Sequence, residues 1–103
     1  MSEWKKVVSL QDIPPLGSRV VKFANGNDVA IFRTADDKVY ALHDQCPHKK
    51  GPLSQGIVHG DKVTCPLHGW NINLADGNAV APDVGHTPCI EVRVENGEVL
   101  LNI

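Results

Sequence analysis

The sequence predicts an all-β fold, and three observations carry that prediction. Apolar residues alternate with polar or smaller neighbours along several short runs, which is typical of half-buried antiparallel strands. Turn sequences rich in Asp, Asn and Gly separate these runs. No stretch of ten residues has apolar side chains at helical spacing. We therefore expect a small antiparallel β-sandwich or partly open barrel that spans residues 1–103 as one domain.

The alternating runs give the expected strands in chain order. A first strand is expected near residues 4–10, and the proline-containing residues 12–17 are expected to form a connector. The later strands are expected at Val21 and Phe23, Val29 and Ile31, Val39 and Ala41, Ile90 with Val92 and Val94, and Val99 with Leu101 and Ile103.

Four short sequences are expected to form turns between strands. Each contains Gly, Asn or Asp, which are the residues that best tolerate turn conformations with positive φ. Asn-Gly between two alternating runs is the strongest hairpin signal. The four turns are Asn25-Gly26-Asn27, Ala35-Asp36-Asp37, Asp76-Gly77-Asn78 and Glu95-Asn96-Gly97.

Charge and composition exclude several classes of partner. Ten basic and twelve acidic residues give a net charge of −2 and are scattered along the chain, so a nucleic-acid partner is not expected. No apolar run approaches the roughly 18 residues of a membrane span, and no signal peptide is recognisable. Three cysteines are too few for a disulfide framework, which favours a reducing compartment. We expect a soluble, cytoplasmic protein.

Two segments pair one cysteine with one histidine. Cys46-Pro47-His48 is followed, after sixteen residues, by Cys65-Pro66-Leu67-His68. A zinc finger usually groups Cys with Cys and His with His, whereas here each segment carries one of each type. A Rieske 2Fe-2S cluster needs two Cys on one iron and two His on the other. Cys46, His48, Cys65 and His68 are therefore the candidate metal ligands, and a mononuclear zinc or iron site is the alternative.

The two motifs resemble the Rieske ferredoxin family. This resemblance implies a Rieske-type fold, in which the cluster-binding loops form a subdomain at one end of the β-structure. Residues 81–83, Ala-Pro-Asp, would form a third loop over the cluster. Neither ligand segment has a second cysteine, unlike those of the high-potential respiratory members. A soluble, lower-potential ferredoxin is therefore expected.

A closer resemblance is to the Rieske-type small subunit of assimilatory NAD(P)H nitrite reductase. It rests on residues 46–68, on residues 81–85, on residues 13–17 after Trp4, and on residues 90–101. The chain departs from that pattern at Lys50, where glycine is common, and at Gly69, where asparagine is common. Gly69 is typical of the C-P-x-H-G loop of ferredoxins that serve ring-hydroxylating or related oxygenases.

The resemblance implies an electron-transfer role in nitrate assimilation. The partner would be a large subunit carrying FAD, an iron-sulfur cluster and sirohaem, on which nitrite is reduced to ammonia. The chain itself has no dinucleotide fingerprint and no nucleophile-base pair outside the ligands, so no catalytic residue is assigned. Two alternatives remain: a ferredoxin between a ferredoxin reductase and an oxygenase, and a metal-stapled structural subunit without redox role.

The other residues able to bind metals or carry charge receive simpler interpretations. Cys89 is expected to be a small buried side chain in a strand. His43, His59 and His86 are expected to be surface or hydrogen-bonded histidines, with His43 close enough to Cys46 to contact the ligands from outside. Lys49 and Lys50 are expected to be solvated charges in a loop. Trp4 and Trp70 are expected to be aromatic side chains that pack in the core or against loops.

Overall fold

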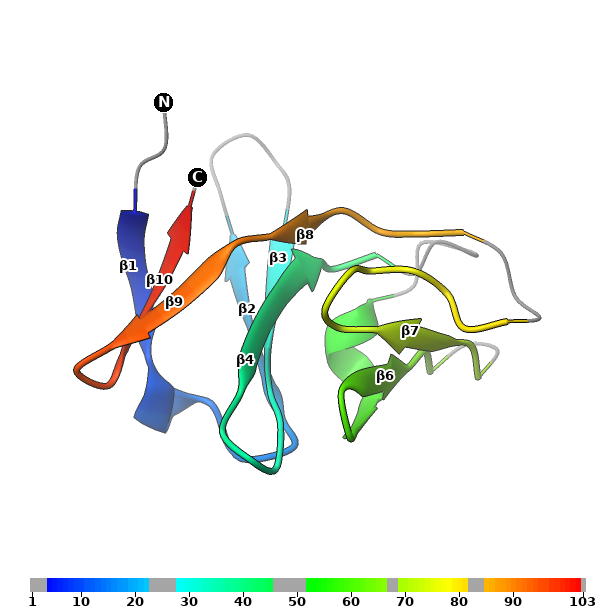
Figure 1. The fold of residues 1–103 in the computed structure, drawn as a ribbon, viewed down its shortest axis with the longest axis horizontal. Coiled ribbons are helices and arrows are strands. Elements are labelled where there is room, and N and C mark those ends of the chain that lie inside the picture. The colour runs from blue at the N-terminus through cyan, green and yellow to red at the C-terminus, as the bar shows by residue number, and fades with distance from the viewer. Residues whose placement is uncertain (1–3, 23–27, 46–51, 67–68, 82–84, 103) are drawn as a thin grey trace.

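The computed structural model describes residues 4–22, 28–45, 52–66, 69–81 and 85–102 (Figure 1). These residues form antiparallel strands and two three-residue 3₁₀ turns, which confirms the all-β prediction. No helix in the described ranges is long and apolar enough to cross a membrane. The expected turn at residues 25–27, with Phe23 and Ile103, lies outside the described residues.

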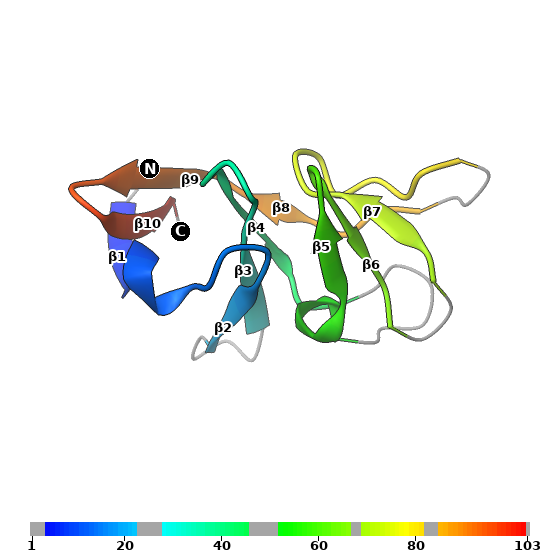
Figure 2. The same cartoon turned by 90° about the horizontal axis from the view of Figure 1, so that it is seen from below.

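The strands form three sheets. The terminal sheet has the order β1-β10-β9, the central sheet β2-β3-β4-β8 and the third sheet β5-β6-β7. The third sheet and the terminal sheet lie at opposite ends of the molecule (Figures 1 and 2). The bounds are β1 Trp4–Ser9, β2 Ser18–Lys22, β3 Asp28–Arg33, β4 Val39–His43, β5 Ile57–His59, β6 Lys62–Thr64, β7 Asn71–Asn73, β8 Cys89–Ile90, β9 Val92–Glu95 and β10 Glu98–Asn102, with the 3₁₀ turns η1 Leu10–Asp12 and η2 Leu53–Gln55.

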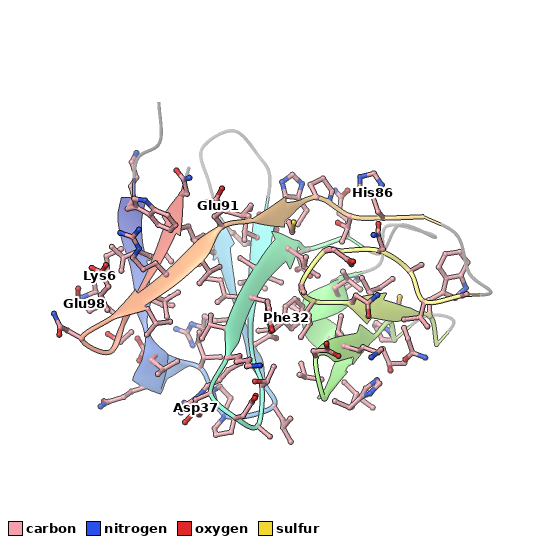
Figure 3. All side chains as sticks on the ribbon, in the orientation of Figure 1. Lys6, Phe32, Asp37, His86, Glu91 and Glu98 are labelled. Carbon is pink, nitrogen blue, oxygen red and sulfur yellow. The ribbon has the colours of Figure 1, made fainter. Side chains whose placement is uncertain are left out.

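The central sheet is covered on both faces, so the expectation of half-buried strands is wrong for β3. Val29 and Ile31 pack into one apolar core with residues of β10. Ala30 and Phe32 face the opposite way, into a second core shared with β5, β6 and β7 (Figure 3). The alternation of apolar and polar residues in a strand predicts that one of its faces is buried. The second face of β3 is also buried, because another sheet covers it.

The terminal sheet follows the predicted hairpin. Asn96 and Gly97 have φ of 52° and 76°, as a two-residue turn with both central residues left-handed requires. This turn joins β9 to β10 with Val94 opposite Val99. Lys6 on β1 forms an ion pair with Glu98 on β10 (Figure 3), with 3.2 Å between Nζ and Oε1.

The third sheet was not predicted as strands. The sequence pattern predicts no strand between Ala41 and Ile90, where the Cys and His segments lie, but residues 57–73 contain β5, β6 and β7. Val58, Val63 and Ile72 are directly opposite one another and buried in the second core. Each strand has three residues and only one inward-facing side chain, so the alternation of apolar and polar residues is too short to recognise.

Candidate metal centre

The second ligand segment leaves the third sheet at β6. Cys65 directly follows this strand, and its side chain is buried, with 1% exposed, in the second apolar core. Its backbone N–H donates to the Trp70 carbonyl at 2.7 Å, and its carbonyl accepts from the Gly69 N–H at 3.1 Å. These bonds close the chain on both sides of residues 67 and 68, and therefore hold both ends of the segment that contains His68.

Gly69 has a left-handed backbone conformation. Its φ is +72°, and no atom of the described residues would lie within 4 Å of an added Cβ. Backbone conformation, rather than crowding, therefore restricts this position. Glycine and asparagine are the residues that adopt this conformation most readily.

The first ligand segment is bracketed by a side-chain contact. The Asp44 carboxylate accepts the Ser54 backbone N–H at 2.7 Å and the Ser54 hydroxyl at 2.9 Å. Asp44 follows β4, and Ser54 is the middle residue of η2. The contact therefore joins the described chain on the two sides of Cys46 and His48.

The expected third loop lies mostly outside the described residues, since residues 82–84 are not described, but backbone hydrogen bonds join its described flanks. The Ala79 N–H donates to the Gly85 carbonyl at 2.8 Å, and Asn78 and His86 form an isolated antiparallel bridge. Val80 N–H donates to the Asn71 carbonyl at 2.8 Å, which ties this stem to β7. The described ends of all three segments are thus fixed by hydrogen bonds.

Only one of the four candidate ligands is placed. Cys46, His48 and His68 lie outside the described residues, as do Lys49 and Lys50. Within the described ranges, no three His, Cys, Asp or Glu side chains come together, so the proposed centre depends on residues beyond them.

The surroundings of Cys65 fit an iron-sulfur cluster. A thiolate buried among apolar side chains is costly unless a positive partner neutralises it. Thiolate is also the soft ligand that iron-sulfur clusters use. Cys65 can therefore serve as a ligand when a metal neutralises its thiolate, and as a neutral thiol it suits the same apolar core.

Cys89 corrects one prediction. It was expected to be buried, but it is exposed, because β8 contributes only two residues at the edge of the central sheet and pairs Cys89 with Leu42. Its neighbour Ile90 packs instead against the first core. Cys89 and Cys65 therefore occupy opposite environments.

The other histidines have backbone or side-chain partners. His59 is exposed, and its Nε2 lies 2.7 Å from the Thr64 hydroxyl, which itself donates to Asn71 Oδ1 at 2.7 Å. The His43 N–H donates to the Pro88 carbonyl at 3.0 Å, and His86 is exposed. The expectation of surface or hydrogen-bonded histidines is met for His59 and His86.

Two carboxylates with shifted pKa values lie at turns. A hydrogen bond from the Thr34 hydroxyl lowers the pKa of Asp36, and the Lys62 ammonium lowers the pKa of Asp61 through a hydrogen bond and its charge. Both remain ionised at neutral pH. Neither belongs to the ligand segments.

The fold and the buried Cys65 define an all-β protein whose third sheet carries a candidate metal centre. A family model described as the Rieske [2Fe-2S] domain matches residues 3–91, and the chain belongs to this family. Membership implies a Rieske-type 2Fe-2S cluster and makes the chain a Rieske electron-transfer protein.

Relatives of similar length fall into two groups. Ferredoxin CarAc of Metapseudomonas resinovorans is 35% identical over 97 residues, covering 93% of this chain and 90% of that protein. The ferredoxin-oxygenase complex of carbazole 1,9a-dioxygenase contains a chain with a TM-score of 0.85 and 32% identity, with 96% and 92% of the two chains covered. The Escherichia coli protein NirD, a nitrite reductase small subunit, has a TM-score of 0.85 and 28% identity, with 100% and 98% covered.

Other relatives are much longer. The 4beta-methylsterol monooxygenase of Methylococcus capsulatus is 41% identical over 61 residues. That match covers 59% of this chain but only 16% of the monooxygenase. Similarity of this kind therefore concerns the Rieske domain alone.

Proposed function

We propose that this chain is the electron-transfer small subunit of an assimilatory NAD(P)H nitrite reductase. Its partner would be a large subunit with FAD, an iron-sulfur cluster and sirohaem that reduces nitrite to ammonia. The observation that carries the proposal is the combined resemblance of residues 46–68, 81–85 and 90–101, together with the full-length structural likeness to NirD.

The glycine at position 69 does not weigh against this proposal. Asparagine is common there in nitrite reductase small subunits, but Gly69 has φ +72° and no atom of the described residues lies within 4 Å of a Cβ added there. Asparagine tolerates the same backbone conformation, so the backbone at this position accepts either residue. The difference is therefore weak evidence for an oxygenase partner.

The proposed ligands are the two Cys and the two His of the motifs. Cys46 and Cys65 would hold one iron, and His48 and His68 the other. When bound, such a cluster accepts and releases single electrons. The chain contributes the buried thiol of Cys65 and the hydrogen bonds that close each ligand segment.

A second candidate is a ferredoxin that serves an oxygenase. The specific observation in its favour is the 35% identity to ferredoxin CarAc over 93% of this chain. A ferredoxin reductase would then supply the electrons. A metal-stapled subunit without redox role is a third possibility, which reversible one-electron reduction of the bound cluster would eliminate.

The partner can be identified directly. The full chain with an affinity tag, expressed in its own host during growth on nitrate, should co-purify a sirohaem protein with nitrite-dependent NAD(P)H oxidation. Gly69→Asn should retain both the cluster and the partner. Recovery of an oxygenase, with no sirohaem protein in the eluate, would contradict the nitrite reductase proposal and support the second candidate.

A further inference from the structure

The segment from Pro52 to Gly56 lies between the flanks of the two ligand segments. On one side, the Ser54 N–H and hydroxyl both donate to the Asp44 carboxylate, at 2.7 and 2.9 Å. The Ser54 carbonyl accepts from the Ser18 hydroxyl at 2.9 Å, which ties the segment to β2. Ser54 therefore makes three hydrogen bonds, two with Asp44, which follows β4, and one with Ser18 of β2.

The Asp44 carboxylate accepts a hydrogen bond from the first turn of η2, as the side chain of an N-cap residue usually does. N–H groups in the first turn of a helix need acceptors from outside it. Pro52, at the N-cap of η2, makes no side-chain hydrogen bond, and Asp44 supplies the acceptor for Ser54 from the end of β4. Hydrogen bonds to a carboxylate are shorter and stronger than neutral ones.

The other side of the segment contacts the strand that leads to Cys65. Leu53 is fully buried and belongs to the same core as Cys65. A Cβ on Gly56 would come within 2.3 Å of the Thr64 carbonyl oxygen, so the backbones are in close contact there. Thr64 is the residue immediately before Cys65. Residues 52–56 thus connect the described flanks of both ligand segments.

We propose that Asp44 and Ser54 are positioning residues of the cluster, which set the first ligand segment relative to Cys65. This inference rests on the proposed ligands Cys46 and His48. The two hydrogen bonds close the chain across those ligands, and Leu53 and Gly56 fix the same segment against β6. Neither residue is a ligand or touches a substrate.

Asp44→Ala and Ser54→Ala test the proposal. Residues that orient metal ligands typically change metal affinity by about 10–100-fold. Asp44→Ala should therefore release the cluster to a chelator about tenfold faster or more and broaden or shift the EPR signal of the reduced protein. Ser54→Ala keeps the backbone bond to Asp44 and should produce a smaller effect in the same direction.

Two further variants distinguish the hydrogen bonds of Asp44 from its negative charge and from a general loss of protein stability. Asp44→Asn retains an acceptor for the Ser54 N–H and a donor for its hydroxyl, so it should restore most of the cluster retention. Asp37→Ala is the matched control, because Asp37 lies in the β3–β4 turn (Figure 3), accepts from Arg33 and has φ +65°. It should lower the unfolding midpoint but leave EPR signal and chelation rate unchanged.

The outcomes are distinguishable. Equal chelation rates and spectra for Asp44→Ala and Asp37→Ala would overturn the positioning role. Asp44→Asn behaving like Asp44→Ala would also overturn it, since the charge rather than the geometry would then matter. Cys46→Ser serves as the reference for the ligand assignment. If Cys46→Ser retained a full cluster, the assignment of Cys46 as a ligand would be wrong, whatever the role of Asp44.

Discussion

At the scale of single residues, the two described cysteines differ most in their exposure to solvent. Cys65 is 1% exposed in an apolar core, whereas Cys89 is exposed on an edge strand. Motif spacing predicts that Cys65 is a ligand and that Cys89 is not, and this assignment stays a prediction. The spacing could not predict the exposure of Cys89. The alternating pattern around Cys89 is the same as that of a buried strand, and it does not reveal that β8 is a short strand at the edge of the central sheet.

Serine substitutions at the two positions should therefore diverge. Cys65→Ser should abolish the cluster and lower the thermal unfolding midpoint, because the domain loses a cross-link between segments. Cys89→Ser should keep full cluster content and change the free energy of unfolding by less than about 0.5 kcal/mol, as is usual for exposed positions. Iron and acid-labile sulfide analysis with thermal melts checks both. Cluster loss in Cys89→Ser with retention in Cys65→Ser would reverse the assignment.

At the scale of elements, turns were predictable and short strands were not. Three of the expected turns, at 35–37, 76–78 and 95–97, contain residues with positive φ, namely Asp37, Gly77, Asn96 and Gly97. Gly60 also has positive φ, in a turn between β5 and β6 that was not expected. Strands β5, β6 and β7 escaped prediction because three residues give too little alternation to recognise. The contact between Asp44 and Ser54 was equally invisible, since nothing in the sequence indicates that residues ten apart will meet.

The turn at Gly77 ties β7 to the stem of the third loop. Gly77 has φ +76°, and a Cβ there would lie 2.0 Å from the Thr87 carbonyl oxygen. The Thr87 N–H also donates to the Gly77 carbonyl at 2.9 Å. The two segments are therefore in backbone contact, which only glycine permits.

Alanine at this turn should be much more costly than alanine at the β9–β10 turn. Gly77→Ala combines left-handed strain of about 1–2 kcal/mol with an overlap that costs about 1–3 kcal/mol. Gly97 has the same φ of +76°, but no atom in the described part of the chain would lie within 4 Å of its Cβ, so Gly97→Ala should show only the strain. Urea unfolding measures both. Equal losses at the two positions would argue against the close contact with Thr87.

At the scale of the whole molecule, the central sheet separates two cores. The terminal sheet covers one face, and the third sheet covers the other and carries Cys65 (Figures 1 and 2). The sequence alone was enough for the fold class and the Rieske family, because the interleaved Cys and His are specific and the strand pattern is regular. The three-sheet arrangement was not predictable, because both faces of β3 are buried and alternation reports only one of them.

The central claim is that this chain holds a Rieske 2Fe-2S cluster through two Cys and two His. EPR spectroscopy of the purified, reduced full-length protein tests it most directly, with iron and sulfide analysis of the same sample. We expect about two irons and two acid-labile sulfides per chain and a rhombic signal with an average g below that of all-cysteine clusters. Stoichiometric zinc without labile sulfide, in protein produced with ample iron and sulfur, would contradict the claim.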